Sequence, residues 1–121
     1  MKLVYWQSAH GQSPIEDEIY EELSKDPKSL QLFEVAERLF KKFGYLQLRK
    51  TKKIDKLAGK NPQKIHEFRM NLFRKIGRIL FIVDNEDEAI LLHFFSKKTD
   101  AIPEKNRNIT ELRATQQRSK K

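Results

Sequence analysis

Two almost continuously apolar runs, residues 77–83 (GRILFIV) and 88–95 (EAILLHFF), constrain the fold of this 121-residue chain more than any other feature. Both have the length of a strand and are rich in strand-forming residues. The polar tetrapeptide between them, residues 84–87, is typical of a turn, so the two runs are expected to pair as an antiparallel hairpin. Strands that are apolar on both sides need cover on both sides, which predicts a central position in a sheet.

Two further segments are expected to be strands, residues 2–6 (KLVYW) and residues 65–71 (IHEFRMN). Successive side chains of a strand point to opposite faces. The second segment should therefore place Ile65, Glu67 and Arg69 on one face and His66, Phe68 and Met70 on the other. A face that mixes a carboxylate with a guanidinium is unusual beside two apolar strands.

The first helix is marked by its N-terminal signal. Ser13 can cap the helix, Pro14 suits the first helical position, and Glu16 would complete a capping box. An apolar stripe then recurs every fourth residue, at Ile15, Ile19 and Leu23.

Asp26-Pro27 ends this helix and begins a second, expected over residues 28–43. Its apolar residues follow the helical spacing closely, and Gly44 stands where a C-terminal cap needs a positive φ. The two helices are expected to form an antiparallel hairpin.

The lysine-rich residues 47–64 are expected to contain only a short anchoring turn, formed by Ile54, Leu57 and Gly59. Pro103 should begin a last helix that reaches about residue 117, with Ile109 and Leu112 on its apolar side. The expected order is β-α-α-β-β-β-α, in a single domain over residues 1–121. This is an α+β fold, with the helices on one face of a small, mainly antiparallel sheet.

The net charge of +8 is unevenly distributed. Residues 1–40 carry four Lys/Arg and eight Asp/Glu, whereas residues 41–83 carry thirteen and two. An acidic start and a basic middle predict two surfaces with different partners. Clustered cations neutralise phosphates and so favour nucleic-acid binding; the alternative is a solvated lysine face that only aids solubility.

Several classes of chemistry lack their motifs in this chain. No GxxxxGK[ST], GxGxxG or HExxH occurs, there is no cysteine, and the three histidines and scattered carboxylates do not predict a metal site. No apolar stretch is long enough for a membrane span, and the N-terminal apolar run is too short for a secretory signal, so a cytoplasmic protein is expected. Phosphoryl chemistry here would need neither metal nor cofactor.

RNA can be cleaved in that way, by attack of a 2′-hydroxyl on the adjacent phosphate. Arginine and lysine on rigid strands can stabilise the extra charge, and a His, a Glu or a lysine of lowered pKa can move protons. Each candidate also has a structural interpretation: an ion pair for Glu67 and Arg69, a strand-edge cation for Arg78, and a hydrogen-bonded core residue for His93.

Four blocks occur in order: SPIEDEIYEEL, IHEFRM, GRILFIV and ILLHFFSKKTDAIP, the last at residues 90–103. Together they resemble the phage-derived, HigB-like members of the RelE/ParE toxin superfamily. The pattern of that group runs S-P-hydrophobic-E-E, then E-L-R, then Y-R-hydrophobic, then L-L-H-x-F-x-K-K-T-x-x-x-P. The similarity spans about residues 2–105.

This resemblance implies the toxin of a type II toxin–antitoxin pair, a metal-free, ribosome-dependent endoribonuclease that cleaves mRNA. It implies a HigA-like helix-turn-helix antitoxin as partner. Carried over by position, the active site would consist of Glu67, Arg69, Arg78, His93, Lys97 and Lys98. Arg78 matches the arginine that contacts the scissile phosphate in RelE-like toxins. Phe68 replaces the family's leucine, and no tyrosine follows Tyr45, so a late catalytic tyrosine used by some members is missing.

The lysine-rich segment is expected to bind ribosomal RNA through Arg49, Lys50, Lys52, Lys53, Lys56, Lys60 and Lys64. Two other functions remain open. One is a ParE-like toxin that inhibits gyrase, which would cause DNA damage instead of mRNA cleavage. The other is a non-catalytic basic RNA- or DNA-binding domain, in which single Arg or Lys changes would weaken binding gradually.

Overall fold

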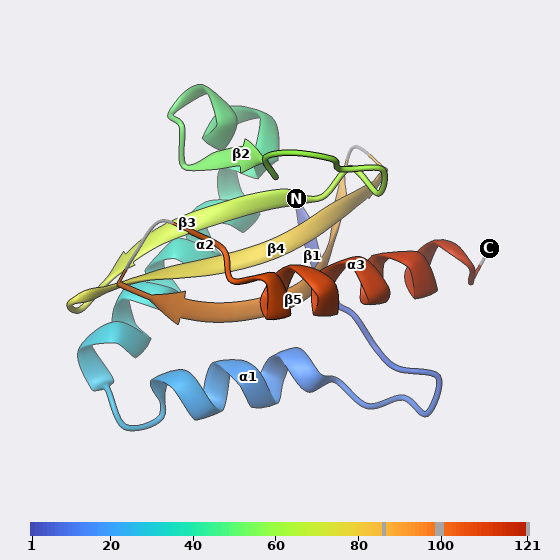
Figure 1. Ribbon diagram of the computed structural model, residues 1–121. Coiled ribbons are helices and arrows are strands. Elements are labelled where there is room, and N and C mark those ends of the chain that lie inside the picture. Colours follow the sequence, from blue (N-terminus) through green and yellow to red (C-terminus); the bar gives the residue numbers. More distant parts are fainter. Residues whose placement is uncertain (86, 99–100, 121) are drawn as a thin grey trace.

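The computed structural model describes residues 1–85, 87–98 and 101–120. Its elements follow in the order β1 (Lys2–Tyr5), α1 (Pro14–Leu23), α2 (Pro27–Lys50), β2 (Ile54–Lys56), β3 (His66–Leu72), β4 (Lys75–Asn85), β5 (Glu88–Lys97) and α3 (Glu104–Arg118). The α+β class is confirmed (Figure 1). No helix in the described ranges is long and apolar enough to cross a membrane.

One sheet of five strands organises the described residues, in the order β1-β5-β4-β3-β2. The first strand pairs with β5 in parallel, and every other pairing is antiparallel. The hairpin β4–β5 lies at the centre, as its two apolar runs predict. Part of the predicted turn between them, Glu86, lies outside the described residues.

The expected element order was wrong at β2, a strand of three residues in the lysine-rich segment. Ile54 is buried and pairs with Phe68 of β3, whereas Asp55 and Lys56 are exposed. A single buried residue between charged neighbours produces no periodic pattern, so the strand leaves no signal in the sequence. The predicted anchors Ile54 and Leu57 are both buried.

Helices cover both faces of the sheet, so the expectation that they pack on one face was wrong. Phe33 of α2 meets Phe94 of β5 edge to face, with ring centroids 5.4 Å apart. His93, which precedes Phe94 in β5, points to the other face, where Asn106 of α3 contacts it. We call the α2 side the back face and the α3 side the front face (Figure 1). Central strands that are apolar on both sides require this double cover.

Helix α1 lies along β5 and makes few contacts with α2, so the expected helical hairpin was also wrong. Strand β1 pairs with only the first residues of β5, up to Leu91. Beyond them, the Glu18 carboxylate of α1 accepts a hydrogen bond from the backbone N–H of Phe94 at 3.2 Å. The helix therefore replaces a neighbouring strand along this edge. It begins at Pro14 as predicted, but Ser13 makes no capping hydrogen bond.

Helix α2 continues past its predicted end. Gly44 has φ 75° and ψ 172°, which interrupts the helix where a C-terminal cap was predicted. The chain then resumes a helical path to Lys50 in a new direction. This kink determines where Tyr45 and Arg49 lie.

The predicted apolar side of α3 was wrong. Leu112 is 60% exposed, and the residues that α3 buries are Thr110 and Ala114. The helix presents polar side chains to the front face of the sheet, where they meet charged residues.

Candidate active site

Strand register brings the predicted residues together on the front face. Across β3, β4 and β5, one row consists of Glu67, Leu80 and His93, and the next consists of Arg69, Arg78 and Phe95. Alternation along β5 puts Lys97 on the same face, one row further. Charged side chains from three strands therefore share one rigid surface.

Glu67 joins the two arginines of this surface. Its Oε1 accepts a hydrogen bond from Arg69 Nε at 2.8 Å, and its Oε2 lies 3.3 Å from Arg78 Nε. Arg69 and Arg78 are directly opposite each other across β3 and β4, where two like charges repel. The carboxylate between them offsets that repulsion and holds both guanidiniums in place.

The two arginines differ in accessibility. The side chain of Arg78 is fully buried, with its guanidinium 5.7 Å from the ring centre of Phe95. The side chain of Arg69 is 49% exposed. In this arrangement the charge of Arg69 is accessible from outside, whereas Arg78 contacts the Glu67 carboxylate from within the fold.

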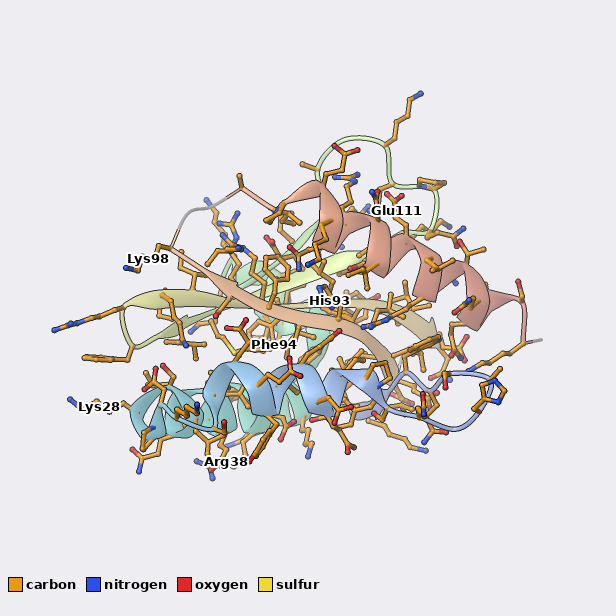
Figure 2. The ribbon with its side chains drawn as sticks, turned by 60° about the horizontal axis from the view of Figure 1, so that its bottom comes forward. Lys28, Arg38, His93, Phe94, Lys98 and Glu111 are labelled. Atoms are coloured by element: carbon orange, nitrogen blue, oxygen red, sulfur yellow. The ribbon has the colours of Figure 1, made fainter. Side chains whose placement is uncertain are left out.

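His93 is a buried residue with both ring nitrogens engaged. Nδ1 lies 2.9 Å from Glu18 Oε1, and Nε2 lies 2.8 Å from Asn106 Nδ2. The ring also stacks on Phe95. Figure 2 shows His93 on the α3 side of β5 and Phe94 on the opposite side. This geometry fits the structural interpretation of His93, since its nitrogens connect α1, β5 and α3.

Glu18 is the centre of that network and escaped prediction from the sequence. Besides His93 it binds Arg113 of α3, at 2.9 Å. Burial raises the pKa of Glu18, but the hydrogen bond and charge of His93, the charge of Arg113 and the Phe94 N–H together outweigh burial and lower the pKa below its ordinary value. Only the helical spacing of Asn106, Thr110 and Arg113, a polar stripe on α3, hints at this network.

Lys97 and Lys98 are exposed at the end of β5. Figure 2 shows Lys98 at one end of the molecule, away from His93 in the middle of the strand. The predicted KKT block continues with Thr99, which lies outside the described residues. The register therefore places Lys97 one row beyond Arg69 on the front face, and Lys98 follows directly after the end of β5.

The seven cations of the predicted RNA-binding segment are all exposed, but they do not form one surface. Lys52 and Lys53 line a hollow of about 310 Å³ that also includes Arg69 and Met70. Arg49, Lys56 and Lys64 line a different hollow beside His66. Lys50 and Lys60 line neither of these two.

Within the described residues, no group of three or more His, Asp or Glu side chains is arranged to hold a metal ion. The front face instead offers guanidinium and ammonium groups. Such groups bind phosphates and stabilise charge that develops on them.

A family model described as phage derived protein Gp49-like (DUF891) matches residues 21–117, most of the chain. No curated protein matches the chain with significant similarity. The matched range includes α2, all strands except β1, and nearly all of α3.

Proposed function

The chain belongs to the phage derived protein Gp49-like (DUF891) family, part of the RelE/ParE-like toxin superfamily, and on this premise we propose that it is a toxin that cleaves mRNA on the ribosome. The reaction is attack by a ribose 2′-oxygen on the adjacent phosphorus. The bond from phosphorus to the 5′-oxygen breaks, the 2′-hydroxyl loses its proton, and the leaving 5′-oxygen gains one.

One observation carries this proposal: a buried carboxylate fixes a half-exposed arginine and a buried arginine side by side on the front face of the sheet. Glu67 contacts Arg69 at 2.8 Å and Arg78 at 3.3 Å. An accessible cation held in a fixed orientation on a rigid strand is suited to stabilising the extra negative charge of a phosphate in its transition state. The cost of opposing two arginines favours a functional interpretation over a merely structural ion pair.

The residues divide into those that meet the phosphate and those that support them. Arg69 is half exposed and, with Lys97 and Lys98, provides accessible positive charge. Arg78 and Glu67 are buried and hold Arg69 in one orientation. His93 acts as a positioning residue, because it fixes β5 against α1 and α3 through its two ring nitrogens.

The decisive variant is Arg69→Gln, tested on programmed ribosomes with the purified chain. Loss of one pre-arranged cation is expected to slow mRNA cleavage by about 100-fold. Primer extension on the mRNA measures the cleavage. Arg74→Gln is the matched control, since Arg74 is an exposed arginine in the turn of the same β3–β4 hairpin and should leave the rate unchanged.

Equal cleavage by wild type and Arg69→Gln would remove Arg69 from the site. Absence of cleavage by the wild type, with DNA damage after induction in cells, would favour the ParE-like alternative. Binding of RNA with neither outcome would indicate a non-catalytic RNA-binding domain.

We further propose that the partner is a HigA-like helix-turn-helix antitoxin. The support is membership of a toxin superfamily, in which growth inhibition requires neutralisation. Co-expression with the product of the adjacent open reading frame should restore growth. Continued toxicity in the presence of that product would argue against the pairing.

A further inference from the structure

A second basic site lies on the back face, away from the Glu67 cluster. Two adjoining hollows of about 470 and 360 Å³ share Tyr45, Lys64 and His66. We call the pair the His66 hollow. Its full lining adds Arg49, Lys56, Leu57, Gly59 and Asn61 on one side and Val83, Asn85 and Arg118 on the other. No acidic side chain among the described residues lines it.

The kink at Gly44 builds one wall of this hollow. With its φ of 75°, Gly44 redirects α2 so that the helical turn of residues 45–50 lies beside the edge strand β2 (Figure 1). Tyr45 and Arg49 are four residues apart and therefore share one side of that turn. An aromatic ring and a guanidinium thus enter the hollow together.

Strand pairing builds the floor. Lys56 of β2 is directly opposite His66 of β3, which in turn is opposite Phe81 of β4. The imidazole of His66 stacks on Phe81, with centroids 5.3 Å apart and ring planes 21° apart. Asp55, the acidic residue of β2, is paired with Glu67, and strand alternation directs both side chains to the front face.

The remaining wall is a braced loop between β2 and β3. The Asn61 side chain makes two hydrogen bonds to the backbone of Ile65, both of 2.8 Å. From α3, Arg107 donates to the carbonyl of Lys60 and Arg118 donates to the carbonyl of Gln63, each at 2.5 Å. The hollow is therefore held in shape before any ligand arrives.

His66 carries an unsatisfied polar atom at this site. The residue is 8% exposed, and its buried Nδ1 has no hydrogen-bond partner among the described residues. Burial, with the charges of Arg49 and Lys56, lowers the pKa of His66 to about 4, so the ring is neutral at physiological pH. The imidazole packs between the rings of Phe81 and Tyr45, whose centroid is 5.5 Å away, and so supports the Tyr45 ring without adding charge.

From this geometry we propose that the His66 hollow binds one nucleotide of single-stranded RNA, with its base against Tyr45, which His66 supports, and its phosphates against Arg49, Lys56 and Lys64. The volume suits a ligand of nucleotide size. A basic groove combined with aromatic rings is how proteins bind unpaired nucleotides. The proposal rests on the proposed function only in taking RNA as the ligand, and it requires no cleavage.

Stacking contacts and phosphate contacts can be distinguished, because only phosphate contacts change how RNA affinity depends on salt. The probe is a fluorescein-labelled oligouridylate, with binding measured by anisotropy across a series of salt concentrations. Tyr45→Leu should weaken binding by about 10-fold at every salt concentration, because it removes a stacking surface. Arg49→Gln should reduce the slope of log affinity against log salt by about 0.7, because it removes one phosphate contact.

Arg38→Gln is the matched control, since it removes the same charge from an exposed position of the same helix. Figure 2 shows Arg38 on the side of α2 that faces away from the sheet. It should change neither affinity nor slope appreciably. Circular dichroism confirms that each variant is folded.

Photo-crosslinking locates the ligand. An oligouridylate that contains 4-thiouridine should cross-link to peptides with Tyr45 or His66. Unchanged affinity of Tyr45→Leu, equal slopes for Arg49→Gln and Arg38→Gln, or cross-links confined to the front face would each overturn the proposal.

These outcomes are independent of the cleavage assay. RNA that binds in the hollow without being cut on ribosomes would refute the proposed function and leave this site in place. Cleavage that persists in Tyr45→Leu with unchanged RNA affinity would do the reverse.

Discussion

At the scale of single residues, Arg78 and Glu67 illustrate how a buried charge depends on its partner. Both side chains are almost inaccessible to water, at 0% and 7% exposure. Removing one partner of such a pair leaves the other charge buried without full compensation, which costs more than the pair contributes. Arg78 is therefore expected to matter for stability as well as for the orientation of Arg69.

This dependence can be measured with Arg78→Met, which is expected to lower the free energy of unfolding by about 3–5 kcal/mol. Adding Glu67→Gln to that variant should recover a large part of the loss, because the buried negative charge disappears with its partner. Urea denaturation of the two single variants and the double variant gives the coupling. Strictly additive losses would show that the two side chains do not stabilise each other.

His66 predicts a pH dependence of stability. Its pKa is lowered to about 4 from 6.5, because the ring is buried and Arg49 and Lys56 are near, while Asp55 opposes the shift weakly. The unfolded chain takes up this proton more readily than the folded chain, so this contribution is complete above pH 6.5 and is lost as pH falls toward about 4.

His66→Phe should flatten the pH profile in that window, since phenylalanine can stack on Phe81 but cannot titrate. Urea midpoints at a series of pH values measure the effect. The neutral-pH stability of the variant serves as its internal reference. An unchanged acid limb would mean that other groups control this range.

At the scale of elements, the kink in α2 depends on a backbone conformation that only glycine adopts easily. Gly44 combines φ 75° with ψ 172°. A Cβ there would meet only Met1 Cβ, at an ordinary 3.8 Å, so the obstacle to a side chain is backbone strain and not lack of space. The strain is worth about 1–3 kcal/mol.

Gly44→Ala should therefore destabilise the chain by about 1–3 kcal/mol and also weaken RNA binding, as Tyr45 and Arg49 lose their position. Urea unfolding and the oligouridylate assay report the two effects. Gln47→Ala, at an exposed position of the same helical turn, should alter neither by much. Full stability and affinity in Gly44→Ala would show that the kink is not needed.

The elements also show which features a sequence reveals. Long apolar runs specify β4 and β5 because many residues repeat the same signal, and the alternation in β3 correctly groups Glu67 with Arg69. Gly44 correctly indicates an interruption of the helix, but it does not indicate that the chain becomes helical again after it. β2 is too short to repeat any pattern.

For the candidate site, the sequence did not reveal which charged side chains are buried or which residues they contact. Alternation along one strand singled out Glu67 and Arg69, and the family resemblance singled out Arg78, but only the structure shows that one carboxylate contacts both arginines. The partners of His93 come from Glu18 and Asn106, which are distant in the chain and carry no motif. The prediction of an apolar side for α3 was wrong because the side of this helix that faces the sheet includes polar residues. Two of them, Asn106 and Arg113, contact His93 and Glu18.

At the scale of the whole molecule, two basic regions lie on opposite faces of one thin sheet. The Glu67 cluster is on the front, and the His66 hollow is on the back. Adjacent residues of β3 supply both, because alternation sends Glu67 and His66 to opposite sides. An RNA strand that meets both sites must pass around an edge of the sheet.

The parallel pairing of β1 with β5 has a consequence for synthesis. Lys2 through Tyr5 leave the ribosome first, yet their partners, Glu88 through Leu91, are among the last residues of the sheet to emerge. Pairing across so great a separation in sequence delays the closure of the fold. The sheet can therefore close only when translation is almost complete, and a truncated product would lack the strand that carries Lys97.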